Sequence, residues 1–285
     1  MISLHILFNS IIMGLLLGGL YALVGLGLSL SFGVMKIINL AHGDLIILSC
    51  YIAFALQTLA GIDPIFSIII LSPCFFLLGY AIQKLIIARA FKINPQTVPI
   101  ITFAISIILQ NTCLLIWTPL SRGLLTYFSL YSLSIYSLNI PLIYLLDFIA
   151  ALAIMIVLKV MLKRSYLGVA IRASSQDWIA SQLMGINTDY IYAIAFALSL
   201  AISAISGVFL GLTVPFTPTS GVAYLLIAFG IVLIGGLGSM LGCFLGGITI
   251  GLIHVLSGLI LGTGWQLFCV CLSIILLLLF KREVK

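Results

Sequence analysis

The stretch from Lys163 to Asp189, K-R-S-Y-L-G-V-A-I-R-A-S-S-Q-D-W-I-A-S-Q-L-M-G-I-N-T-D, is the one long polar interruption in an otherwise apolar chain. Apolar side chains recur in it at roughly helical spacing, which predicts a short amphipathic helix: Leu167, Ile171, Trp178, Ile179 and Leu183. Connections between elements are usually about 4–6 residues long. We therefore expect this segment to dock on a partner or lie beside the bilayer, with a plain solvated loop as the alternative.

The composition outside this stretch is that of an integral membrane protein. Of 285 residues, 64% are hydrophobic and 6% are charged, against roughly 25% charged in soluble domains. The net charge is +6, and the basic residues lie at the ends of apolar runs. This placement is typical of residues that orient a membrane protein, and it argues against binding of nucleic acid. The cysteines lie in apolar runs without metal-ligand spacing. We expect one all-α transmembrane domain over residues 1–285 and no metal site or cofactor.

The apolar runs predict eight or nine membrane-spanning helices. A bilayer core of about 30 Å needs about 20 apolar residues as helix. The expected spans are Ile6–Phe32, Leu45–Ala60, Ile65–Ile87, Thr97–Trp117, Ile140–Leu158, Tyr190–Leu212, Val222–Leu241, Leu245–Leu261 and Trp265–Phe280. Glycine breaks leave open whether residues 222–262 cross twice or form a re-entrant hairpin.

The basic residues predict the orientation of these spans. If nine segments alternate, four basic clusters fall on one side: Lys36; Lys84, Arg89 and Lys92; Lys159 to Arg172; and Lys281, Arg282 and Lys285. Only Arg122 falls on the other side. Because basic residues gather on the cytoplasmic side, we expect a multi-pass inner (plasma) membrane protein with a periplasmic N-terminus, a cytoplasmic C-terminus and residues 163–189 in the cytoplasm. The loop Thr118–Asn139 and the turn Gly61–Pro64 would then face outward, where an extracytoplasmic partner could dock.

Small residues spaced four apart predict close helix packing. Glycine pairs of this kind let helix backbones approach one another in lipid. They occur at Gly14/Gly18, Gly242/Gly246 and Gly247/Gly251. Taken together, they indicate a tightly packed bundle and carry no functional information of their own.

A polar break, Lys36-Ile-Ile-Asn39-Leu-Ala-His42-Gly43-Asp44, separates the first two spans. Polar groups at a membrane break need partners, because each unsatisfied group costs several kcal/mol in hydrocarbon. Two interpretations remain open. Asn39, His42, Gly43 and Asp44 form part of a translocation path or gate, or Asn39 or Asp44 caps the second helix while His42 is hydrated.

Other polar residues at membrane depth are few, and each is expected to form an interhelical hydrogen bond: Gln110, Asn111, Asp147 and His254. The chain has no Gly-Lys dipeptide and so no P-loop, and no H-E-x-x-H or G-x-S-x-G motif. An enzyme is therefore disfavoured. Ion-coupled carriers bury ionisable residues near the midplane, and the sequence suggests His254 alone, so the energy should come from another subunit. A self-sufficient secondary transporter of a small solute remains the alternative.

Two long stretches resemble a known family. The first runs from Gly18-Gly-Leu-Tyr21 through Phe32-Gly33 to Asn39-Leu-Ala-His42-Gly43-Asp44 and is similar to the N-terminal signature of LivH-type permeases of branched-chain amino acid ABC importers. The second comprises Arg172-Ala173, Ala180-x-x-x-Met184-Gly185-Ile186-Asn187, Phe196-Ala-Leu-Ser199, Ala204-x-x-Gly207, Ala228-Phe229, Gly235-Gly236-Leu-Gly238-Ser239 and Gly242-x-x-x-Gly246-Gly247. The match covers nearly the whole chain in the same order. Departures are the Ser/Tyr/Leu-rich outer loop and Ser181, where the family often has alanine.

The resemblance implies an importer that works by alternating access. Its parts would be this subunit in the lipid bilayer, a second homologous permease, two cytoplasmic ATP-binding subunits and a periplasmic substrate-binding protein. The usual substrates are branched-chain amino acids, and related members carry other small amino acids or amides. The core Ala180-Ser181-Gln182-Leu183-Met184-Gly185 resembles the coupling loop of such permeases, which implies an ATPase-coupling site formed by Arg172, Trp178, Ile179, Ala180, Ser181, Leu183 and Gly185. The sequence does not identify the substrate, and it does not distinguish a homodimer from a heterodimer of permeases.

Overall fold

The computed structural model describes residues 4–135 and 138–283, and these are mostly helical. The long helices are α1 (Leu4–Met35), α2 (His42–Ala60), α3 (Pro64–Ile82), α5 (Thr97–Trp117), α6 (Leu142–Arg164), α9 (Thr188–Thr213), α10 (Gly221–Gly235), α11 (Met240–Leu261) and α12 (Gln266–Glu283). The shorter helical elements are η1 (Gln83–Ile87), α4 (Ala88–Ile93), η2 (Tyr127–Leu130), α7 (Tyr166–Gln176), α8 (Trp178–Leu183) and η3 (Thr263–Trp265), and the strands are β1 (Ser132–Ile135) and β2 (Leu138–Pro141). The all-α prediction holds, apart from one small antiparallel hairpin.

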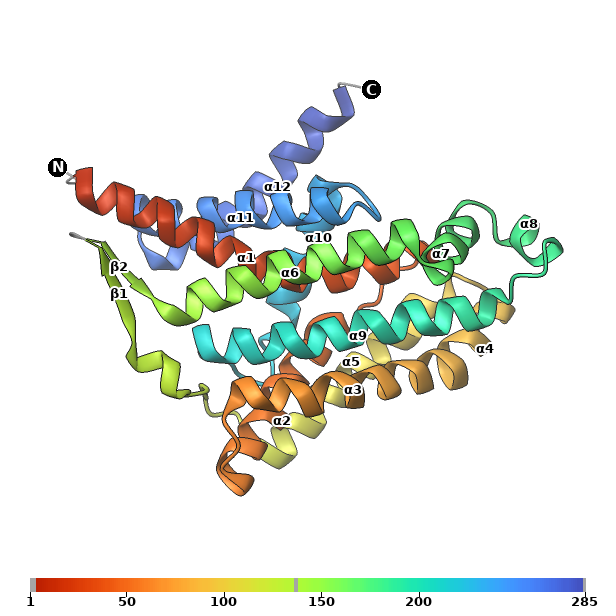
Figure 1. Ribbon diagram of the computed structural model, residues 1–285, viewed down its shortest axis with the longest axis horizontal. Coiled ribbons are helices and arrows are strands. Elements are labelled where there is room, and N and C mark those ends of the chain that lie inside the picture. The colour runs from red at the N-terminus through yellow and green to blue at the C-terminus, as the bar shows by residue number, and fades with distance from the viewer. Residues whose placement is uncertain (1–3, 136–137, 284–285) are drawn as a thin grey trace.

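The helices α1 and α9 form the centre of the bundle. Both run along the long axis of the molecule, side by side with α6 (Figure 1). In each, 78% of the most apolar window is buried within the chain, against 17% in α5 and 22% in α3 and α6. The outer helices therefore carry the apolar surface that is left for lipid or for another subunit.

Close packing of α1 against α11 follows from small residues on both helices. A Cβ atom added at Gly18 would lie 2.6 Å from Ile248 Cα, and one added at Gly247 would lie 2.5 Å from the backbone nitrogen of Ala22. Such distances are below any ordinary contact, so a larger side chain would separate the two helices. The predicted role of the glycine pairs in helix packing is confirmed for Gly14/Gly18 and Gly247/Gly251, which face one another across this interface.

Seven helices in the described residues are long and apolar enough to cross a membrane, and two shorter apolar ones accompany them, Gly221–Gly235 and Thr263–Leu279. Each of the nine expected spans thus corresponds to an apolar helix. The expected bounds Val222–Leu241 were wrong. The helix ends at Gly235, and a turn with positive φ at Gly236 (91°) and Gly238 (76°) leads into α11. At about 1.5 Å per residue, α10 is about 22 Å long, shorter than a bilayer core.

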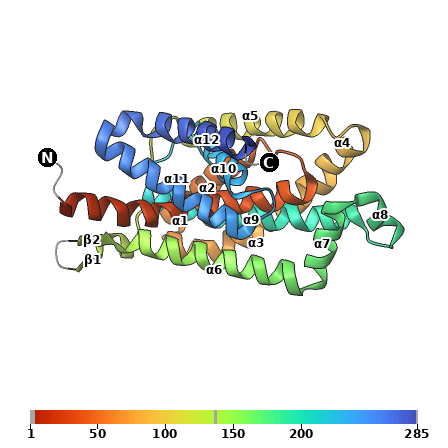
Figure 2. The ribbon, with the colours of Figure 1, turned by 90° about the horizontal axis from the view of Figure 1, so that it is seen from above.

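The two ends of the bundle carry different elements. The tip formed by α4, α7 and α8 lies opposite the N-terminus and the β1–β2 hairpin (Figures 1 and 2). At the hairpin end the two predicted outer loops meet, because Thr126 Oγ1 donates a 2.6 Å hydrogen bond to Asp63 Oδ2. Arg122 was expected to be exposed on the outer side, but it is half-buried. Its guanidinium donates to the Trp117 carbonyl at 2.9 Å and lies over the Phe54 ring. Lys285 lies outside the described residues.

Candidate functional site

The polar stretch that interrupts the apolar sequence folds into two helices, α7 and α8, where one was expected. Ser165 Oγ accepts from Gly168 N at 2.9 Å and caps the start of α7. Asp177 has an extended backbone (φ −146°), ends α7 and caps α8 by accepting from the amides of Ile179 and Ala180 at 2.9 and 3.0 Å. A side-chain oxygen of this kind satisfies free amides at a helix start. The chain therefore turns sharply at Asp177 and projects α8 from the bundle.

The apolar side chains of this stretch divide between two surroundings. Ile171 on α7 is 2% exposed and packs into the bundle, whereas Ile179 and Leu183 on α8 are 54% and 83% exposed. Trp178 and Met184 are also exposed, while Ser181 is buried and Arg172 and Ala180 face outward. A hollow of about 230 Å³ beside them is lined by Ala173, Gln176, Asp177, Ala180, Ser181, Met184 and Ile186. Hence α8 presents an apolar surface that the other described residues leave open.

Gly185 ends this projection with a backbone that favours glycine. Its φ is +84°, in the left-handed region, and a Cβ added there would meet no atom within 4 Å. The amides of Gly185 and Ile186 bond back to the carbonyls of Gln182 and Ser181, a common helix ending. A side chain at this position would be limited by backbone strain and not by space.

The polar break after α1 returns into the bundle. Lys36, directly after the end of α1, has φ +55°. His42 is fully buried, and its Nε2 lies 3.0 Å from the Val24 carbonyl while its Nδ1 lies 3.4 Å from Ser203 Oγ on α9. At about 1.5 Å per residue, the part of α1 from Val24 to Met35 is about 16 Å long. His42 therefore lies deep in the bundle, and the alternative in which His42 is hydrated was wrong.

Asp44 joins three helices at a similar depth. It is 3% exposed, and its Oδ2 and Oδ1 accept from Ser106 Oγ at 2.5 Å and Gln110 Nε2 at 3.1 Å, both on α5. Gly43 beside it touches Gly221, the first residue of α10, and a Cβ on Gly221 would in turn collide with Asp44. The starts of α2 and α10 thus meet at Asp44, whose negative charge suits helix N-termini.

Neither Asp44 nor Asn39 caps the second helix in the expected way. No side chain bonds to the first amides of α2 from the cap position, which Ala41 occupies. The Asn39 side chain is 2% exposed and its Oδ1 accepts from Ala41 N at 3.1 Å. Its Nδ2 has no hydrogen-bond partner among the described residues. The four residues of the possible path or gate therefore lie together inside the bundle: Asn39, His42, Gly43 and Asp44. Their role there stays a prediction.

The four other polar residues at membrane depth behave differently from one another. Gln110 bonds to Asp44, and Tyr21 Oη lies 3.1 Å from His254 Nδ1, so both expected interhelical bonds are present. Asn111 was predicted wrongly, because its amide donates to the Ile107 carbonyl of its own helix. Asp147 is fully buried, and neither carboxylate oxygen has a hydrogen-bond partner among the described residues.

Buried ionisable groups are more numerous than the sequence suggested. His42, Asp44 and Asp147 all lie inside the bundle in addition to His254, so their supposed absence is no argument against an ion-coupled carrier. The reading of the sequence also missed Ser106 and Ser203, which contact the polar break. A signal for the second was present, since Ser199 and Ser203 are four apart in an apolar span and share a helix face. In the described residues, no cluster of His, Cys, Asp or Glu could hold a metal ion.

These features define a class of protein: a polytopic helical membrane protein with a buried polar junction and a projecting apolar helix at one end. Residues 10–280 match the family model of the permease component of branched-chain amino acid transport systems. The chain belongs to this family.

Individual relatives agree with the family model over most of their length. The branched-chain amino acid permease BraD of Pseudomonas aeruginosa is 29% identical, over 96% of this chain and 93% of its own. The permease LivH of Escherichia coli K12 is 28% identical, over 89% and 86%. A probable LivH of the archaeon Methanocaldococcus jannaschii is 27% identical, over 91% and 85%. No solved structure matches. The relatives are named transport permeases, and none is named an enzyme.

Proposed function

We propose that this chain is a membrane-spanning permease subunit of an ABC importer for branched-chain or other small amino acids, or related amides. A periplasmic binding protein would deliver the substrate, and two separate cytoplasmic ATPases would drive its passage. The observation that carries this proposal is α8, whose apolar side chains Trp178, Ile179 and Leu183 stay exposed at the tip of the bundle. An exposed apolar patch of this kind marks a contact with another protein or with the membrane.

The buried junction around Asp44 would belong to the translocation path or its gate. There the starts of α2 and α10 meet inside the bundle, and transporters place substrate sites where short or interrupted helices meet at depth. Asp44, His42 and Asn39 supply polar groups, and Gly43 lets the backbone of α2 approach Gly221. Movement of α10 against α2 would open or close this junction.

The other end of the bundle would receive the binding protein. Asp63 and Thr126 tie the turn before α3 to the loop before the hairpin. Beside them, Leu125, Tyr127 and Leu130 are 73%, 65% and 84% exposed, and exposed aromatic and apolar groups favour protein contacts. In this arrangement the signal of a loaded binding protein and the motion of the ATPases arrive at opposite ends of α1, α6 and α9.

Copurification tests the proposal against its alternative, a self-sufficient secondary transporter. The full chain, tagged and isolated from its native membrane in mild detergent, should retain a P-loop ATPase and a second permease, identified by mass spectrometry. The purified complex in vesicles should take up leucine only with ATP on the ATPase side and the binding protein outside. Uptake by the chain alone, driven by an ion gradient, would establish the secondary transporter instead.

A further inference from the structure

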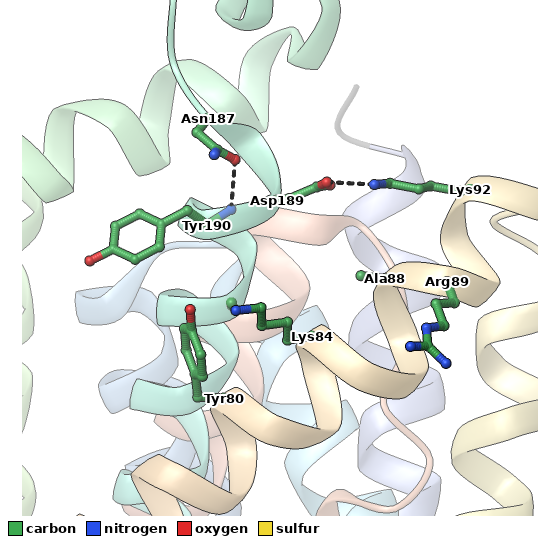
Figure 3. A pocket seen from close by; sticks show the side chains of 9 residues that line it. Tyr80, Lys84, Ala88, Arg89, Lys92, Asn187, Asp189 and Tyr190 are labelled. Atoms are coloured by element: carbon green, nitrogen blue, oxygen red, sulfur yellow. Dashed lines mark hydrogen bonds and ion pairs between the residues drawn. The ribbon is translucent and has the colours of Figure 1, made fainter.

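A cationic pocket of about 410 Å³ lies between the α3–η1–α4 stretch and the start of α9. Its volume is in the range of about 300–1,000 Å³ that is typical of ligand sites. Six of the side chains that line it carry charge or an aromatic ring: Tyr80, Lys84, Arg89, Lys92, Asp189 and Tyr190. Figure 3 shows them around the first turn of α9. Neither the transport proposal nor the family assigns a role to this pocket.

The charges in the pocket do not balance. Lys92 Nζ lies 2.7 Å from Asp189 Oδ2, and this is the one ion pair within the part of the chain that the structure describes. The two side chains are 67% and 54% exposed, so the pair contributes little stability. Lys84 and Arg89 have no acidic partner in the described residues. The pocket therefore holds two positive charges in excess and favours an anionic ligand.

The two lysines line the same pocket from different turns. Both side chains extend toward α9 at different heights: Lys92 reaches Asp189 at its start, and Lys84 lies lower, with its Nζ 5.5 Å from the centre of the Tyr80 ring (Figure 3). Lys84 belongs to η1, a π-helical turn, and such turns are frequent at functional sites. Arg89 is directed to the far side of α4 in the same view, so we assign the ligand contact to Lys84 and Lys92 and treat Arg89 as a rim charge.

Apolar surface borders the pocket. Leu77 on α3 lies seven residues before Lys84, which places it on the same face of this helical stretch, and it is 67% exposed. Tyr190 is 50% exposed at the mouth, and tyrosine is enriched where a membrane meets water. The pocket thus lies where a lipid-facing helix surface ends. A soluble anion would use the charges alone, whereas a phospholipid would use the charges and this apolar border.

We propose that this pocket binds the phosphate headgroup of an anionic membrane phospholipid, with its acyl chains along the face of α3 that carries Leu77. Basic pockets between helices at a membrane surface have the chemistry for such headgroups. The positive charges of Lys84 and Lys92 would attract the phosphate, and the Asp189 carboxylate would compete with it for Lys92. This inference concerns the isolated chain and does not depend on what the protein transports.

The test measures lipid retained by the purified full chain in detergent, using phosphatidylglycerol and phosphatidylcholine with identical acyl chains and native mass spectrometry. The wild-type chain should retain phosphatidylglycerol in preference. K84Q/K92Q should bind it about thirtyfold more weakly, about fivefold for each lysine, with phosphatidylcholine unchanged. D189N should bind it more tightly, because a competing carboxylate is gone, and a merely structural role of the ion pair does not produce this gain.

The matched control is K281Q/R282Q, which removes the same charge from the C-terminal end of α12, outside the pocket. It should keep the preference for phosphatidylglycerol. Equal loss in both double variants would show a general electrostatic effect and overturn the proposal, as would no loss in K84Q/K92Q. Displacement of the lipid by millimolar inorganic phosphate would also overturn it, because the site would then take the free anion. Thermal unfolding of each variant checks that the chain remains folded.

Discussion

Asp44 and Ser106 lie 62 positions apart in the chain, yet the carboxylate of the first accepts a 2.5 Å hydrogen bond from the hydroxyl of the second inside the helix bundle. The contact joins the start of α2 to the middle of α5, and Gln110 adds a second donor from one turn further along. A buried carboxylate is costly unless it is hydrogen-bonded. Asp44 also lies against the first residue of α10. A movement of α10 would therefore act on α2 and α5 through the Asp44 side chain.

We expect Asp44→Asn to lower substrate uptake by about tenfold or more while the amount of protein in the membrane stays the same. An amide keeps the shape but loses the charge, and its nitrogen faces one of the two donors of α5, so one hydrogen bond of about 1–3 kcal/mol is lost. Uptake of labelled leucine, normalised to an immunoblot, measures this.

The matched control for Asp44 is Asn111→Ala on α5. The Asn111 side chain bonds within its own helix and is exposed on the outside of the chain, so uptake should stay close to wild type. If Asp44→Asn lowers uptake and abundance in the same proportion, the carboxylate serves stability and not transport.

Asn39→Ala and His42→Ala test the rest of the polar junction. Both should reduce uptake at unchanged protein level if these residues form a gate. Ser203→Ala is the control for His42, because it removes the 3.4 Å contact to the ring but leaves the bond to the Val24 carbonyl. A fall in abundance that accounts for all of the lost uptake would assign both residues to structure alone.

Cysteine labelling in intact cells tests the orientation. The expected result is that cysteines at Lys92 and Arg172 are shielded from an impermeant maleimide, and that one at Ser121 is labelled, since positive residues favour the cytoplasm. Ser121 replaces its neighbour Arg122 as the outer probe because Arg122 is half-buried and bonded to Trp117. The unsubstituted chain, with its six native cysteines, sets the background. Labelling at 172 with shielding at 121 would invert the orientation.

The sequence predicted what depends on neighbours along the chain and missed what depends on packing. Apolar runs located the helices because each satisfies its own backbone in lipid, and small residues predicted close helix packing but not that α1 and α11 would be the partners. The hydrogen bond between Asp44 and Ser106 could not be predicted from the sequence, because it forms only when α2 packs against α5. The break at Asp177 had a local signal, a helix-capping residue, but the helical spacing on both sides of it concealed two separate helices.

Arg172→Ala should weaken coupling to the ATPase only mildly. Arg172 is exposed on α7 near the projecting helix, and a charge at the rim of an interface mainly steers association, which salt screens. Substrate-stimulated ATPase activity of the reconstituted complex should fall by less than about threefold at low salt and by nothing measurable at high salt. A complete loss at both salt concentrations would place Arg172 in the core of the contact.

Gly185→Leu and Ala180→Glu should detach or uncouple the ATPase while the subunit stays in the membrane. Gly185 has φ +84° with open space around it, so leucine costs about 1–2 kcal/mol of backbone strain and redirects the exit of α8. Ala180 is exposed beside the 230 Å³ hollow, where a carboxylate would prevent an apolar contact. The matched controls are Gly185→Asn, because asparagine tolerates the left-handed region, and Gln96→Glu, which adds the same charge at an exposed position on another loop. Both controls should keep substrate-stimulated ATPase activity near wild type. Wild-type stimulation in both test variants would show that the segment from Lys163 to Asp189 is an ordinary connection.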